Sequence, residues 1–216
     1  MVRRFFQDQG GSAAEFALIL PLSLALLFGI IDSGRYFWEI NRAEKATQAG
    51  ARLAAVTAMI PQGVANYAYS LDAGLPQGSA VGEDYFTGVE CTGTSNTTVD
   101  CGWTTDPDDP YDLEPDNCAF EMIVTRMRDY MPTLQGENVS VLYTNSGLGF
   151  AGDPSGPDVA PLVTVRIVGM EFRPILTSVF GLGWGLPTAP YTLTQEDGTG
   201  QWFEEFDGAD FPEACA

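Results

Sequence analysis

The chain opens with the longest apolar stretch in its sequence. From Phe16 to Ile31 no residue carries a charge, and Ala13 and Ala14 extend this run on its N-terminal side. A helix needs roughly 17 to 20 mostly apolar residues to cross the hydrocarbon core of a bilayer. The run therefore predicts a single membrane-spanning helix at the short end of that range.

The residues that flank this run indicate its orientation. Arg3 and Arg4 precede it, which favours an N-terminus left in the cytoplasm, and the aromatic residues 36–38 follow it and suit the far interface. The run is longer than the apolar part of a usual secretory signal, and the following DSGRYFWEI is a poor cleavage site. We therefore expect a retained single-pass anchor with the rest of the chain outside.

The helical pattern continues beyond the apolar run. No proline lies between Asp32 and Ile60, and Pro61 is the next helix breaker. We predict one helix over residues 13–60, about 72 Å long at 1.5 Å per residue, with one turn loosened by Pro21. Its later half is amphipathic and carries small residues on one face, which permits close packing on the chain's own domain or on a neighbouring subunit. These interface candidates are Ala43, Thr47, Gly50 and Ala54.

Residues 61–216 have a different composition, with more glycine, proline, threonine and aspartate and with shorter periodic runs. Residues 90–103 fit a hairpin, and a helix is expected from its cap Asp116 to Pro132. Alternation of apolar and polar residues, together with β-branched residues, predicts strands over residues 139–144, 161–172 and 191–195. A short helix is expected over residues 174–180. The predicted fold class is α+β, in which the long N-terminal helix packs on a small antiparallel sheet domain. One face of the helix after Asp116 is expected to be apolar, with Phe120, Ile123, Met127 and Tyr130.

The charge of the chain lies almost entirely in this second part. Residues 61–216 hold four basic and 24 acidic groups, a net charge of −20, whereas residues 1–60 have a net charge of +1, which together make the −19 of the chain. A domain this acidic repels nucleic-acid phosphates, so we expect no nucleic-acid partner. The chain contains no histidine and shows no nucleophile motif, so we do not expect an enzyme.

The cysteines all follow the apolar run and include no CxxC pair, so a zinc site has little support. An even number in an exported domain suggests two disulfides, with three possible pairings. The preferred pairing closes the hairpin and ties down the C-terminal tail, as Cys91–Cys101 and Cys118–Cys215.

The sequence DPDDPYDLEPDN, residues 106–117, concentrates side-chain oxygens. Calcium takes six to eight oxygen ligands, so calcium is the one cofactor that the sequence suggests. However, Tyr111 occupies the position where an EF-hand loop needs glycine, and three prolines interrupt the stretch, so a solvated acidic loop is the favoured alternative. The candidate calcium ligands are Asp106, Asp108, Asp109, Asp112, Glu114 and Asp116.

Glu15 places a carboxylate where the apolar run begins. Ser12-Ala13-Ala14-Glu15 fits a capping box, in which the serine caps the helix and the glutamate reaches back. Alternatively, the carboxylate pairs with a cation inside the membrane, because an ionisable group in a spanning helix is costly and usually has a partner. The residues alone leave both interpretations open.

Gly10, Gly11, Glu15 and Phe16 together resemble the G-x-x-x-x-E-F processing site of prepilins of the tight-adherence (Tad/Flp) class of type IV pili. The sequence that follows, from Glu15 to Ala55, is similar to that of TadE-like pseudopilins, with Pro21, Gly29, Gly34-Arg35 and Gly50-Ala51-Arg52 in the expected order. This resemblance implies that a membrane prepilin peptidase cuts after Gly10 and removes residues 1–10 as a leader. It also implies that Glu15 neutralises the new terminal amine of an adjacent subunit during assembly.

The resemblance further implies a structural subunit, a minor pilin or pseudopilin, with the large domain outside the cytoplasm. Expected partners are other pilin subunits, the prepilin peptidase, the inner-membrane assembly platform and membrane lipid. The expected location is the bacterial inner membrane, with the domain in the periplasm or in an extracellular pilus. The alternative is an unprocessed, single-pass surface binding module that depends on calcium, in which residues 10–15 form only a turn and a helix cap.

Overall fold

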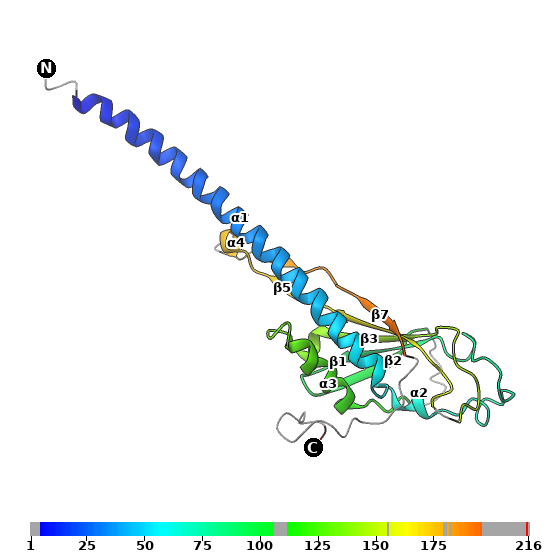
Figure 1. Ribbon diagram of the computed structural model, residues 1–216. Helices are drawn as coiled ribbons and strands as arrows, with labels where there is room; N and C mark the ends of the chain where they lie inside the picture. The colour runs from blue at the N-terminus through cyan, green and yellow to red at the C-terminus, as the bar shows by residue number, and fades with distance from the viewer. Residues whose placement is uncertain are drawn as a thin grey trace. The chain divides into compact units, whose positions relative to one another are not determined.

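The computed structural model describes residues 5–105, 112–154, 156–178, 181, 183–195 and 215. A long helix precedes a set of short helices and antiparallel strands, so the fold is α+β, as expected (Figure 1). In chain order the elements are α1 (Phe5–Val56), α2 (Gln62–Asn66), β1 (Gly88–Gly93), β2 (Val99–Trp103), α3 (Asn117–Arg128), the 3-10 turn η2 (Gly136–Asn138), β3 (Val139–Thr144), β4 (Leu162–Ile167), β5 (Glu171–Phe172), α4 (Ile175–Ser178), β6 (Trp184–Gly185) and β7 (Tyr191–Thr194).

Helix α1 runs without interruption through Pro21, and both of its ends differ from the prediction. It begins at Phe5, so Ser12 lies inside the helix and not at its N-cap, and the capping-box interpretation of Ser12 and Glu15 is wrong for this chain. It ends at Val56 instead of Ile60, because the backbone of Ile60 bonds elsewhere. The Ile60 N–H donates to the Tyr143 hydroxyl, and the Ile60 carbonyl accepts from the N–H of Asp116.

The chain forms two compact units. The first contains residues 1–41 together with residues 171–186, and the second contains residues 42–170 and 187–216. This division differs from the predicted boundary at residue 61. The later turns of α1 group with the sheet, while a short segment between β4 and β7 groups with the earlier turns of α1.

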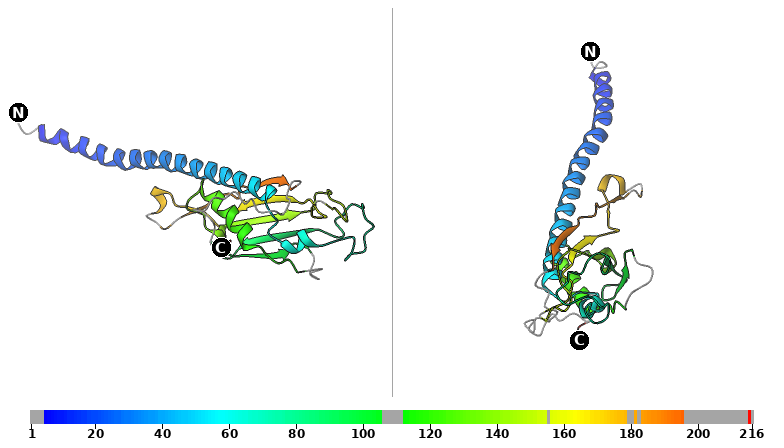
Figure 2. Two further views of the ribbon diagram at one scale, coloured as in Figure 1. Left: turned by 60° about the horizontal axis from the view of Figure 1, so that its bottom comes forward. Right: turned by 90° about the vertical axis from the view of Figure 1, so that its right-hand side faces the viewer.

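The second unit is built on a five-stranded antiparallel sheet with the strand order β2-β1-β3-β4-β7 (Figure 2). Strand β3 has the predicted bounds, but the strand predicted over residues 161–172 is split into β4 and β5. The split follows from local hydrogen bonds and backbone geometry. The Val168 N–H donates to the carbonyl of Asn138, and Gly169 then adopts a φ of 69° that turns the chain out of the ladder.

The hydrophobic core of this unit lies between one face of the sheet and two helices, α3 and the later turns of α1. Phe120, Ile123 and Met127 of α3 are fully buried, as the predicted apolar face requires. Tyr130 is 40% exposed, so its place on that face was predicted wrongly: α3 ends at Arg128, before Tyr130. Asp116 caps α3 as predicted, because its side chain accepts from the N–H groups of Cys118 and Ala119.

Gly93 and Gly102, both in the β1–β2 hairpin, provide a matched test of this packing. A Cβ on Gly93 would overlap the carbonyl oxygen of Gly136 and lie 2.6 Å from Cζ of Phe120, whereas a Cβ on Gly102 meets nothing within 4 Å. We expect Gly93→Ala to lower the free energy of unfolding by about 1–3 kcal/mol, the usual cost of overpacking. Gly102→Ala should change it by less than about 0.5 kcal/mol. Urea unfolding of both variants checks this, and equal losses would contradict it.

Candidate processing and assembly site

The residues of the predicted processing site lie together in the early turns of α1. Gly10 and Gly11 are part of the helix, and Glu15 and Phe16 follow about one turn later. Both later side chains are exposed, with Phe16 at 64%. Among the residues that the structure describes, Glu15 has no hydrogen-bond or ion-pair partner. Within the described part of this chain, the Glu15 carboxylate is therefore available to pair with a group of another molecule.

The apolar run itself presents its large side chains outward. Ten of them between Phe16 and Ile31 are at least 40% exposed. Among the described residues, α1 is the one helix long and apolar enough to cross a membrane, and its most apolar stretch is not buried by the rest of the chain. A helix that is apolar all round is either the buried core of a larger assembly or a membrane span. The exposed large side chains are Phe16, Leu18, Ile19, Leu20, Leu22, Leu24, Leu26, Leu27, Ile30 and Ile31.

Asp32, for which the sequence predicts no role, follows the apolar run and has a buried carboxylate. The residue is only 5% exposed. Its Oδ1 accepts the N–H of Ile175 at 2.8 Å and its Oδ2 accepts the N–H of Leu176 at 2.9 Å, both in the first turn of α4. Arg35 forms an ion pair with Asp32 at 3.1 Å. Asp32 therefore fastens α4 to α1 next to the last residue of the run.

The four small residues predicted as a helix interface are buried within the second unit. Ala43, Thr47 and Ala54 are at most 2% exposed, and Gly50 is also buried. A Cβ on Gly50 would lie 2.8 Å from Cγ and Sδ of Met127, so α1 and α3 approach closely at this glycine. Of the two packing alternatives, the structure shows the contact with the chain's own domain, and this face is not free to bind a neighbouring subunit.

The predicted calcium ligands lie only partly in the described residues. Asp106, Asp108 and Asp109 are outside them. Asp112 and Asp116 accept backbone N–H groups, and Asp116 also accepts the side-chain amide of Gln62 at 3.1 Å. Within the part of the chain that the structure describes, no group of three or more acidic or cysteine side chains is placed to hold a metal. Calcium binding stays a prediction, which calcium titration calorimetry on the oxidised chain can test.

Both predicted disulfides are confirmed. Cys91 and Cys101 are direct partners in the β1–β2 register, with their Cα atoms 4.0 Å apart. Cys118, at the start of α3, bonds to Cys215, with a Cα–Cα distance of 4.8 Å. The second bond joins the C-terminal end of the chain to α3 across 97 residues of sequence.

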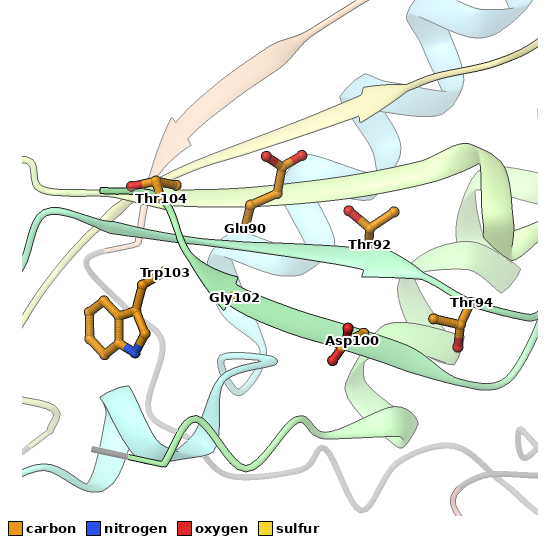
Figure 3. A pocket seen from close by; sticks show the side chains of 7 residues that line it. All are labelled: Glu90, Thr92, Thr94, Asp100, Gly102, Trp103 and Thr104. Atoms are coloured by element: carbon orange, nitrogen blue, oxygen red, sulfur yellow. The ribbon is translucent and has the colours of Figure 1, made fainter. Parts of the chain in front are cut away.

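A shallow hollow of about 450 Å³ lies on the β1–β2 hairpin, and it was not predicted. In Figure 3 the Glu90 and Thr92 side chains point to one side of the hairpin, while the Trp103 indole points to the other. The Glu90 carboxylate already accepts from the Ser140 hydroxyl at 2.7 Å and pairs with Arg166. These contacts place Glu90 in the polar network of the sheet, so its carboxylate is already occupied at the hollow.

The contacts of Glu90 predict an acid-dependent contribution to stability. The hydrogen bond from Ser140 and then the Arg166 guanidinium hold the pKa of Glu90 below its ordinary value of 4.5. Because the folded pKa is lowered, this stabilisation is present above pH 4.5 and is lost as the pH falls through the folded pKa. Glu90→Gln should remove it, by less than about 1 kcal/mol since the pair is partly exposed. The check is the free energy of unfolding in urea, measured from neutral to acidic pH, with Glu83→Gln, at an exposed glutamate, as the control. If this free energy depended on pH in Glu90→Gln as it does in the wild-type chain, the prediction would be contradicted.

Comparison with known proteins adds one finding. Residues 10–52 match the family model described as TadE-like protein, and residues 53–216 lie outside the match. No curated protein and no solved structure matches the chain. The matched segment begins at Gly10 and covers Glu15, the whole apolar run and the small-residue face up to Arg52.

Proposed function

We propose, from the match of the N-terminal segment to the TadE-like family of Tad pilus-associated proteins, that this chain is a minor pilin or pseudopilin of a Tad-type pilus. A prepilin peptidase removes residues 1–10, and the mature subunit assembles through α1. The observation that carries the proposal is Glu15, an exposed carboxylate without a partner in the described residues, at the start of an apolar run that the rest of the chain does not bury. The family is structural, and we propose no catalytic role.

The chemistry of assembly follows from the position of Glu15. Cleavage after Gly10 makes Gly11 the new N-terminus, with Glu15 as the fifth residue of the mature chain. A terminal ammonium and a carboxylate are each costly in lipid, and they become tolerable as a pair. Glu15 of one subunit therefore pairs with the terminal amine of the next, and the apolar side chains between Phe16 and Ile31 supply the packing surface around that pair.

The proposed topology has one span. The N-terminus lies in the cytoplasm, α1 crosses the inner membrane, and the acidic sheet unit lies in the periplasm or in the extracellular pilus. The proposed partners are other pilin subunits, the prepilin peptidase and the membrane assembly platform. Since the small-residue face of α1 is covered by the chain's own domain, subunit contacts fall on the earlier part of the helix, before Asn41.

The test is the intact mass and N-terminal sequence of the chain recovered from cells with an active prepilin peptidase. A chain beginning at Gly11 is expected. Gly10→Leu should leave the full-length chain, because a bulky side chain would occupy the residue whose peptide bond is cut, and Gly29→Leu on the same helix should still be processed. Wild-type protein that still begins at Met1 would contradict the proposal and favour the unprocessed surface binding module.

A further inference from the structure

The segment Glu171–Leu186 is attached to α1 at the point where the apolar run ends. Its backbone binds the Asp32 carboxylate through two N–H groups of α4. Phe172 is 4% exposed and packs against Tyr36, with 5.4 Å between the ring centroids. The Arg35 guanidinium lies over the Phe172 ring, 5.3 Å from its centroid. These contacts all lie within the first compact unit, and Figure 1 shows α4 beside α1. The segment is thus held at a defined level of the helix.

Three large apolar side chains of this segment are exposed, next to the exposed charged residues Glu171 and Arg173. Ile175 is 44% exposed, Leu176 38% and Trp184 53%. Trp184 lies beside Tyr36, with ring centroids 6.3 Å apart. On α1 itself Phe37 and Trp38 are more than 60% exposed at the same level. Large apolar side chains in water cost about 25 cal/mol per Å² of surface, so this group requires a cover.

The residue types among these exposed side chains indicate that a lipid bilayer covers them. Tryptophan and tyrosine concentrate where a bilayer meets water, because each ring has an apolar body and a polar tip. The group also adjoins the apolar run directly, since Asp32, to which α4 is bound, follows Ile31 in the sequence. Any bilayer that receives the run as far as Ile31 therefore brings its interface to α4.

A hollow on α1 supports the same assignment. It measures about 400 Å³ and is lined by Ile31, Gly34, Arg35, Trp38 and Glu39, which occupy one face of the helix. A Cβ on Gly34 would meet nothing within 4 Å, so the missing side chain keeps the hollow open. The end of the hollow next to the apolar run is formed by Ile31, and the Arg35 guanidinium lies one turn further along the helix. This arrangement suits a lipid whose acyl tail lies along Ile31.

We infer that the segment Glu171–Leu186 docks into the outer-leaflet interface of the membrane that α1 crosses, with Ile175, Leu176 and Trp184 in contact with lipid. The inference rests on the membrane span of the proposed function. The docked segment is a second membrane contact, and because Asp32 fastens it to α1, it sets the depth of the helix in the bilayer.

The experiment uses the full chain in phosphatidylcholine vesicles whose acyl chains are brominated close to the headgroup. One variant retains Trp184 alone, with Trp38, Trp103 and Trp202 replaced by phenylalanine. A second retains Trp103 alone, and a third carries Leu24→Trp in a tryptophan-free chain. Bromine should reduce the fluorescence of Trp184 and of the Leu24→Trp probe by about twofold or more, as expected for rings at or below the interface, and leave that of Trp103 unchanged.

The three probes separate failure of the inference from failure of the span. Quenching of the Leu24→Trp probe without quenching of Trp184 overturns the inference alone, and shielding of Trp184 from aqueous acrylamide in that case would assign the surface to contact with a second copy of the chain. No quenching of either probe overturns both the span and the inference. Asp32→Ala, which removes the carboxylate that holds α4, should reduce the quenching of Trp184 and leave that of the Leu24→Trp probe intact.

Should the tryptophan replacements prevent folding, a second measurement keeps the test open. The wild-type chain is labelled with 5-fluorotryptophan, and its Trp184 resonance is identified by its loss in Trp184→Phe. Paramagnetic lipid should broaden this resonance and spare that of Trp103. Equal broadening of the two resonances would overturn the inference.

Discussion

Pili assembled in the presence of the Glu15→Gln variant are expected to contain at least about tenfold less of this subunit than pili with the wild-type chain, although the leader is still removed. Glutamine keeps the shape of the side chain but lacks its charge, so the terminal amine of the adjacent subunit would enter the apolar environment unpaired. Breaking one partner of a buried ion pair costs about 3–5 kcal/mol, and each 1.4 kcal/mol is a factor of ten in an equilibrium constant. The measurement is the amount of the subunit in sheared pili relative to the membrane fraction.

Two variants make this test specific. Glu15→Asp retains the carboxylate and should recover part of the incorporation. Glu44→Gln removes an exposed carboxylate from the same helix beyond the apolar run and should leave incorporation unchanged. Normal incorporation of Glu15→Gln would show that Glu15 is not the assembly charge. An unprocessed leader in Glu15→Gln would assign this residue to peptidase recognition instead.

The second large effect is expected for Asp158→Ala, in the loop before β4. Asp158 is 6% exposed, and its carboxylate accepts three backbone N–H groups: that of Tyr69 at 2.9 Å, Gly152 at 2.9 Å and Asp153 at 3.0 Å. Hydrogen bonds to a charged group contribute about 1.5–3 kcal/mol each and are not additive. We expect the variant to lose about 3–4 kcal/mol of unfolding free energy, because it leaves those donors without their acceptor.

Urea unfolding of the full chain in detergent micelles measures this loss. Asp72→Ala, which removes an exposed aspartate from the loop after Tyr69, is the matched control and should change the unfolding free energy by less than about 0.5 kcal/mol. Asp158→Asn should fall between the two, since its amide keeps one acceptor oxygen. A loss below about 1 kcal/mol in Asp158→Ala would mean that water replaces the carboxylate at the three N–H groups.

Local features of this chain could be predicted from its sequence, because each depends on neighbouring residues. The alternation over residues 139–144 predicts β3, Asp116 caps α3, and the ten-residue spacing of Cys91 and Cys101 matches a hairpin whose strands pair at those positions. The length of the apolar run likewise predicts a helix that can cross a membrane. Such features need no knowledge of distant parts of the chain.

Features that depend on distant partners could not be predicted. The N–H groups that bind Asp32 lie more than 140 residues away, and nothing in a lone aspartate after an apolar run indicates them. The carboxylate of Asp158 similarly binds the N–H of Tyr69 across 89 residues. The predicted helix start is wrong because the serine-to-glutamate spacing favours a cap at Ser12, whereas α1 begins at Phe5 and continues through Gly10 and Gly11.

The order of the strands has a consequence for subunits stored side by side in a membrane. Confinement to two dimensions brings many copies together, and exposed sheet edges then invite strand pairing between copies. Here the two edges are the five-residue β2 and the four-residue β7. Strand β2 carries the exposed charge of Asp100 and is bonded to β1 through Cys101, which restrains it from peeling away towards another chain. For the proposed pilus subunit, two short edge strands, one of them charged, disfavour such pairing between neighbouring copies in the membrane.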